Sequence, residues 1–175
     1  MTFGLTPLGV LHTIVSLVAI AAGIAALVRY REISPRSRAG RVYVASTVVV
    51  CLTGFGIFQH GGFGPPHALG IITLATLGVA YAAGRGRFGR FSRRLEIVTY
   101  SLTFFFHSIP GVTESLTRLP YGHPLVKTQE DPVFPMIYGA FFVIFLVLVV
   151  LQVRWLGAHE ATGARDWEDE GQRPA

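Results

Sequence analysis

Charged side chains are scarce in this sequence, and those present are unevenly placed. Of the 175 residues, 14% are charged and 51% are hydrophobic, whereas soluble domains carry about a quarter charged residues. The charges gather in short stretches between long apolar runs, which is typical of a chain whose solvent is partly hydrocarbon. The composition therefore excludes an ordinary soluble domain and predicts an integral membrane protein.

Cysteine and recognisable catalytic motifs are also lacking. The single Cys51 can form neither an internal disulfide nor a cysteine metal cage. There is no Walker sequence, dinucleotide glycine fingerprint, nucleophile elbow or His-Glu-x-x-His pair. The net charge of +5 does not indicate nucleic acid as a partner, because the arginines flank apolar runs instead of alternating with aromatic residues. We interpret them as topology signals and as contacts to anionic lipid.

Long uncharged apolar runs define the expected fold. A hydrocarbon core of about 30 Å requires about 20 apolar residues in a helix. The fourth of the runs found is the weakest, because residues 108–111 interrupt it and Pro110 is expected to kink the helix. The sequence thus predicts an all-α membrane bundle with five spanning helices, at about residues 7–28, 42–59, 67–84, 95–116 and 133–156.

The arginines predict the direction of each span. Lys and Arg accumulate in short cytoplasmic loops, and five arginines lie in each of the first and third connecting stretches. The second connection, residues 60–66, has no charge. We therefore expect the N-terminus outside and the C-terminus in the cytoplasm. Residues 1–156 would form the membrane domain, and residues 157–175 a solvated, disordered tail.

Small residues indicate where helices can approach closely. The last run is instead bulky nearly all round, so we expect it at the edge of the bundle, facing lipid. The candidates for close packing are Ala19, Ala22, Gly23, Gly54, Gly56, Gly70 and Ala75.

Five of the six histidines fall toward the outer side in this topology. His12 would lie roughly 7 to 8 Å below the outer end of its helix, and His107 roughly 18 Å above the cytoplasmic end of its own. His60 and His67 flank the second connection, and His123 lies in the outer loop after the fourth span. Ionisable residues inside a membrane usually face the bundle interior and serve function, so His12 and His107 are candidate site residues.

A carboxylate accompanies these histidines. Glu114 follows His107 by seven residues, on nearly the same helical face, and precedes Arg118 by four. It could therefore lie above the imidazole, or form an interfacial ion pair with Arg118. Tyr100, Thr99 and Thr103 lie deeper on this helix, as possible hydrogen-bonding groups.

Two stretches resemble a family of small bacterial membrane proteins defined by a domain of unknown function. They are residues 40–44 (Gly-Arg-Val-Tyr-Val) and residues 62–74, which begin Gly-Gly-Phe-Gly-Pro-Pro-His. The likeness runs from about Leu11 to Arg118 and implies a helical bundle in a bacterial inner membrane. His12 and His67 match histidine positions of the family pattern. Two other family histidines are replaced here, at residues 37–39 and in the arginine-rich third connection, which weakens any cytoplasmic cofactor site.

Three hypotheses for function remain open. The first is electron transfer, with haem b held by His12 and His67, or by His107 with either of them. A transition metal would instead use His60, His67, His123 and Glu114. The second is transport of protons or a small solute, in which the histidines relay protons. The third is a non-catalytic role as a homo-oligomer or as the partner of another membrane subunit.

Overall fold

The described part of the chain folds into five α-helices and one short 3-10 helix. The computed structural model describes residues 6–58, 62–120 and 122–171, with the side chains of the last helix described as far as His159, and the described residues contain no strand. The elements are α1 (Pro7–Tyr30), α2 (Arg38–Gly54), α3 (Pro65–Gly84), η1 (Gly89–Phe91), α4 (Ser92–Arg118) and α5 (Val133–Gly171). The all-α prediction is confirmed.

Three of the helices are long and apolar enough to span a membrane. They are α1, α3 and the part of α5 from Val133 to His159. By contrast, α2 has only 17 residues, and the buried residues of α4 are mostly polar. Length and composition therefore support membrane insertion through α1, α3 and α5.

The helices lie where the apolar runs predicted them, but α2, α3 and α4 begin earlier, and α2 ends at Gly54 instead of about residue 59. The second helix begins at Arg38 instead of residue 42, because the Ser37 side chain accepts a hydrogen bond from the backbone N–H of Gly40 at 3.0 Å. Such an N-cap fixes the first turn of a helix whatever the charge of the residues in it. The fourth helix likewise includes Arg93, which the search for uncharged runs left out.

Pro110 does not end α4, which continues through it to Arg118. Proline removes one backbone donor from the helix interior. Nearby hydroxyls bond to carbonyl oxygens of the preceding turn: Ser108 donates to Phe104 at 2.9 Å, and Thr113 donates to Ile109 at 2.8 Å. The interruption seen in the sequence is therefore accommodated within one helix.

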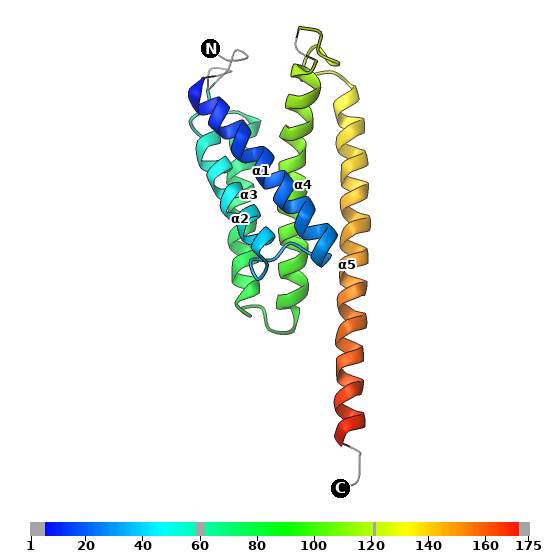
Figure 1. Ribbon diagram of the computed structural model, residues 1–175. Helices are drawn as coiled ribbons and strands as arrows, with labels where there is room; N and C mark the ends of the chain where they lie inside the picture. The colour runs from blue at the N-terminus through cyan, green and yellow to red at the C-terminus, as the bar shows by residue number, and fades with distance from the viewer. Residues whose placement is uncertain (1–5, 59–61, 121, 172–175) are drawn as a thin grey trace.

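The last helix extends far beyond the predicted span. Residues 157–171, which the sequence favoured as a disordered tail, are helical and continue α5. This segment contains three alanines and three glutamates, which are strong helix formers. Figure 1 shows α5 projecting well past the ends of the other helices.

Helices α1 to α4 form a bundle in which α1 contacts α2 and α4, and α3 contacts the same two helices. As predicted, α5 lies at the edge, packed along α4 (Figure 1). Polar links hold it there, among them a hydrogen bond from the Gln152 side chain to the backbone oxygen of Arg31 at 2.8 Å. Ser101 donates to the Gln152 side chain at 2.8 Å, and the Thr113 and Tyr138 hydroxyls lie 2.6 Å apart. Since α5 exposes large apolar side chains such as Val143 and Ile144, its outer side suits lipid.

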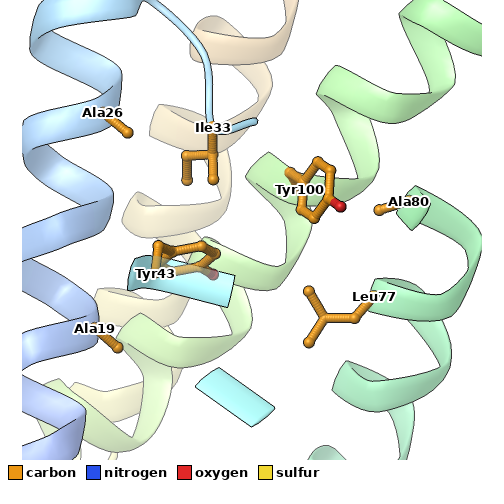
Figure 2. Packing of buried hydrophobic residues seen from close by; sticks show 7 residues of the cluster. All are labelled: Ala19, Ala26, Ile33, Tyr43, Leu77, Ala80 and Tyr100. Carbon is orange, nitrogen blue, oxygen red and sulfur yellow. The ribbon is translucent and has the colours of Figure 1, made fainter. Parts of the chain in front are cut away.

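The core combines small residues of α1 with tyrosines from the neighbouring helices (Figure 2). Tyr43 of α2 and Tyr100 of α4 are almost fully buried, and Ala19 and Ala26 let α1 approach closely. The Tyr43 hydroxyl lies 3.0 Å from the Thr103 hydroxyl of α4. The core therefore places polar atoms between helices, where water is absent and each polar atom needs a partner.

Most of the small residues predicted for close packing occupy helix contacts. A methyl group added at Gly23 would lie 2.5 Å from Phe104, one at Gly54 would lie 3.4 Å from the His12 ring, and one at Gly70 would lie 2.9 Å from Phe55. Ala75, by contrast, is exposed. The tightest position is Gly40, where a methyl group would lie only 2.0 Å from the Ser34 carbonyl oxygen. Gly40 thus allows the loop between α1 and α2 to lie against α2.

Replacing Gly40 should therefore destabilise the bundle. We expect Gly40→Ala to lower the free energy of unfolding by about 1–3 kcal/mol, the usual effect of overpacking, measured by chemical denaturation in detergent micelles. Gly78→Ala is the matched control, because its added methyl group meets nothing within 4 Å and alanine favours a helix. Equal stability of the two variants would contradict the close approach at Gly40.

Candidate functional site

His12 is held by Thr53 on the neighbouring helix. Its Nδ1 lies 3.0 Å from the Thr53 hydroxyl oxygen, while that hydroxyl donates its hydrogen to the backbone oxygen of Val49 at 2.8 Å. Because the hydroxyl hydrogen is already used, Nδ1–H of His12 must be the donor to Thr53. The Nε2 atom of a neutral His12 therefore keeps a free lone pair.

His107 lies inside the bundle, on the side of α4 that faces α1. It is buried, with 7% of its surface exposed, and it interacts electrostatically with Ser16 and His12 of α1. The His12 ring itself packs against Thr53 and Gly54 of α2, so these two of the three histidines predicted to bind a cofactor lie in the same part of the bundle. The predicted neighbour Glu114 also acts electrostatically on His12, and its carboxylate pairs with Arg118.

His67 occupies a different environment, at the start of α3. Its Nδ1 accepts a hydrogen bond from the backbone N–H of Gly64 at 3.2 Å and so caps the helix. Its ring lies between Phe58 and Phe63, with centroid distances of 5.1 and 5.3 Å. The Nε2 atom is buried without a hydrogen-bond partner. Since Nδ1 acts as acceptor, Nε2 carries the hydrogen, and His67 could coordinate a metal only by breaking this cap.

The four residues predicted to bind a transition metal are not seen together. His60 lies outside the described residues, His123 is exposed in the loop after α4, and Glu114 is half-exposed. Among the residues with described placement, no group of three or more His, Cys, Asp or Glu side chains is close enough to hold a metal ion. The set as a whole stays a prediction, because one member lacks a described position.

A second polar cluster, which the sequence analysis missed, lies at the other end of the bundle. Glu96 of α4 is 2% exposed and accepts hydrogen bonds from Arg36 at 2.8 Å and from Arg93 at 3.0 Å. Arg93 also donates to Glu32 at 2.6 Å. These four side chains alternate in sign and join the loop between α1 and α2 to the first turns of α4. Their charges sum to zero.

The ion pairs also act on the ionisation of Arg93. Burial alone would lower the pKa of its guanidinium, but the hydrogen bonds and negative charges of Glu32 and Glu96 outweigh this effect and raise the pKa. Arg93 therefore stays charged and bridges two carboxylates. A chain of paired charges is favourable only when every member is present, so the loss of one carboxylate should affect the whole cluster.

Buried polar residues connect the two clusters along α4. Glu96, Tyr100, Thr103 and His107 are all buried, and their spacings of four, three and four residues place them on one face of the helix. Glu114 continues the same face at the outer end. From Glu96 to Glu114 is 18 residues, or about 27 Å of helix, close to the thickness of a hydrocarbon core. We call these five residues the polar face of α4.

The sequence indicates the polar face of α4 only through the spacing of its polar residues. Glu96 precedes His107 by 11 residues and Glu114 by 18, both near whole numbers of helical turns. The search for uncharged runs set the start of the fourth span at about residue 95 and gave Glu96 no role. Glu96 pairs with Arg36, 60 positions away, and Arg93 pairs with Glu32, 61 positions away, which no local pattern indicates.

Comparison with known proteins adds no further assignment, since the chain matches no family model, no curated protein and no solved structure. The resemblance to small bacterial membrane proteins stays a prediction.

Removing the Glu96 carboxylate should weaken the contact between α4 and the α1–α2 loop. We expect Glu96→Gln to lower the free energy of unfolding in detergent by roughly 1–3 kcal/mol, because hydrogen bonds to charged groups contribute about that much. Glu114→Gln is the control, since Glu114 is 47% exposed and an exposed ion pair contributes about 0–1 kcal/mol. If both variants lost the same stability, the buried cluster would not be structurally important.

Proposed function

We propose that this chain is a multi-pass protein of a bacterial inner membrane that moves protons along the polar face of α4. The observation that supports this is the row of buried polar residues from Glu96 to His107, about one helical turn apart over about 17 Å, which the half-exposed Glu114 extends to about 27 Å. Ionisable residues within a membrane are unfavourable, and they usually mark ion pathways and proton relays. Apolar helices around α4 would keep this row away from lipid.

In this proposal all five helices cross the bilayer, with the N-terminus outside. The loops after α1 and α3 lie toward the same end of the bundle (Figure 1), where Arg36 and Arg93 bind the same carboxylate. Arginine-rich loops favour the cytoplasmic side. The histidine pair then lies toward the outer surface, and the Glu96 cluster lies at the inner one.

The relay would use side chains that can both accept and release a proton. An imidazole can take up a proton at one ring nitrogen and release one from the other, and His12 and His107 lie at the outer part of the row. The paired hydroxyls of Tyr43 and Thr103, 3.0 Å apart, continue it inward. Tyr100, one turn further along, interacts electrostatically with Glu96. About 6 Å of helix separates Thr103 from His107, so the proposed relay needs a water molecule at this step.

Proton movement is tested in liposomes that contain the purified protein and an internal pH dye. Under an imposed potential, we expect wild-type protein to acidify or alkalinise the lumen, and His107→Ala to reduce the initial rate about tenfold or more, as for the loss of a group that transfers protons. Tyr43→Phe should also slow the flux, because it removes one hydroxyl of the row.

The control variant is His123→Ala, which alters an exposed histidine of a loop and should keep the wild-type rate. Wild-type flux no greater than that of empty liposomes would reject the proposal. A wild-type rate in His107→Ala would remove that residue from the pathway.

The second candidate function is binding of haem b or a transition metal for electron transfer, and the free Nε2 lone pair of His12 favours it. Histidines that bind metals usually donate their other ring N–H to a hydrogen-bond acceptor, as His12 does to Thr53. Haem can be held between facing helices of a bundle. His107 is the second ligand that this geometry favours, because His67 uses its Nδ1 lone pair in the α3 cap.

This alternative predicts a spectrum. The detergent-purified protein would show a Soret band or one bound metal ion per chain, and His12→Ala would lose it while His159→Ala, an exposed histidine of α5, would keep it. Purified wild-type protein with neither signal would reject this function while leaving proton movement intact.

Assembly with further subunits fits either function. The apolar outer side of α5 would face lipid, a second copy or another membrane protein, with anionic lipid bound at the arginine-rich end of the bundle.

A further inference from the structure

A basic cavity lies where α1 ends and α2 begins. Its volume is about 820 Å³, and its lining includes four arginines, Arg29, Arg36, Arg38 and Arg41, with Glu32 as the only acidic residue. Four positive charges and one negative charge give a formal charge of +3 at this site. Glu32 is moreover paired with Arg93 at 2.6 Å. The cavity therefore favours a ligand with negative charge.

The four arginines differ in how they are held. Arg36 is fixed at one side of the cavity by Glu96 and by Ser34, with distances of 2.8 and 3.2 Å. The Arg29 guanidinium lies 5.7 Å from the Tyr30 ring centroid. Arg38 and Arg41 are exposed, and no ion pair of either is found among the described residues. Two guanidinium groups are thus available to a ligand beside two that are already oriented.

This placement of arginines is not explained by the stability of the helix. Arg38 and Arg41 lie in or next to the first turn of α2, which contains no acidic residue. Positive charge near a helix N-terminus is unfavourable, because the helix dipole is positive there. The repulsion among these groups would be relieved by an anion in the cavity.

The chemistry of the cavity suits a phosphate group. Arginine has a planar, forked set of donors that matches phosphate oxygens, and it keeps its charge at any physiological pH. Ser34 and Ser37 also line the cavity and add hydroxyl groups. A phosphate can accept hydrogen bonds from several such donors at once.

The position of the cavity points to a lipid as the source of that phosphate. It lies at the end of α1, the helix that is apolar and long enough to span a membrane. Val28 and Ile24, in the last turns of α1, are 80% and 50% exposed. Apolar side chains beside a basic cavity match the acyl chains and the headgroup of one molecule, and clusters of arginines next to a membrane helix attract anionic lipids.

We propose that this cavity binds the phosphate group of an anionic phospholipid. The site uses residues apart from the polar face of α4, and it does not depend on which side of the membrane it faces. Arg36 and Arg29 form its fixed wall, and Arg38 with Arg41 closes over the headgroup. Since Arg36 also binds Glu96, an occupied cavity would strengthen the contact between the α1–α2 loop and α4.

The test compares lipids added to the full-length protein in a neutral detergent, with the thermal midpoint of unfolding as the readout. A ligand that binds the folded state raises this midpoint with its concentration. We expect phosphatidylglycerol to raise it and phosphatidylcholine to have little effect. The double variant R38Q/R41Q should bind phosphatidylglycerol about tenfold more weakly or worse.

The matched control is R85Q/R87Q, which removes the same charge from the loop after α3 and should bind phosphatidylglycerol within about twofold of wild type. An equal loss in both double variants would mean nonspecific attraction, and it would overturn the site. Stabilisation by soluble glycerol phosphate but not by phosphatidylglycerol would assign the cavity to a soluble phosphate compound and overturn the lipid. A midpoint of R38Q/R41Q without lipid that equals or exceeds that of wild type will show that the variant is folded, since removing these charges relieves their repulsion.

Discussion

A helix that carries carboxylates, imidazoles and hydroxyls on one face can lie in a bilayer only when other helices cover that face. This constraint governs the arrangement of the chain. Helix α4 contacts α1, α3 and α5, which are the three helices apolar enough to span a membrane. Its polar side chains Glu96, Thr103 and His107 are all buried as a result. The apolar helices expose large apolar side chains on their outer sides, which suits contact with lipid.

The polar atoms of the interior are paired by residues from the other helices. Tyr43 meets Thr103, Gln152 meets Ser101, and Thr53 meets His12. Such contacts contribute modestly in a membrane, about 0.6 kcal/mol on average. Leaving a buried polar group unpaired lowers the stability of the fold more than pairing it raises that stability. These contacts therefore fix the relative rotation of the helices more than they add to stability.

At the arginine-rich end of the bundle, some charged side chains form ion pairs with one another and others line the basic cavity. Within the bundle, Glu96 and Glu32 neutralise Arg36 and Arg93 in one alternating cluster. Outside it, Arg38 and Arg41 have no described ion pair and line the basic cavity. Because Arg36 belongs to both groups of residues, a ligand in the cavity and the start of α4 are connected through a single side chain.

Much of this fold could be predicted from apolar run length alone, since each of the five runs corresponds to a helix. The predicted helix bounds were wrong where local capping or helix propensity decides the structure. Ser37 caps α2 and starts it early, and residues 157–171 are helical. Similar depth predicted His12 and His67 as the first pair of ligands, whereas His67 caps α3 through its Nδ1. The cap made by His67 depends on a single backbone N–H, that of Gly64.

The ion pairs of Glu96 were out of reach for a different reason. The pairs Arg36–Glu96 and Arg93–Glu32 join segments about 60 residues apart, and only the packing of the α1–α2 loop against α4 brings them together. The basic cavity likewise required the turn between α1 and α2, in which Gly40 allows the Ser34 backbone to approach. The spacing of residues in the sequence predicts which face of a helix is polar. Which residues pair with that face depends on how the helices pack in the folded bundle.

The central claim is that the polar face of α4 points into the bundle and not toward lipid or water. Spin labels placed singly along residues 95–110 in liposomes measure this directly, through their collisions with oxygen, which concentrates in lipid. The account predicts a helical period in oxygen accessibility, with minima at Glu96, Tyr100, Thr103 and His107 and higher values at Val98 and Leu102. Maxima at the four polar positions, or an absence of periodicity, would contradict it.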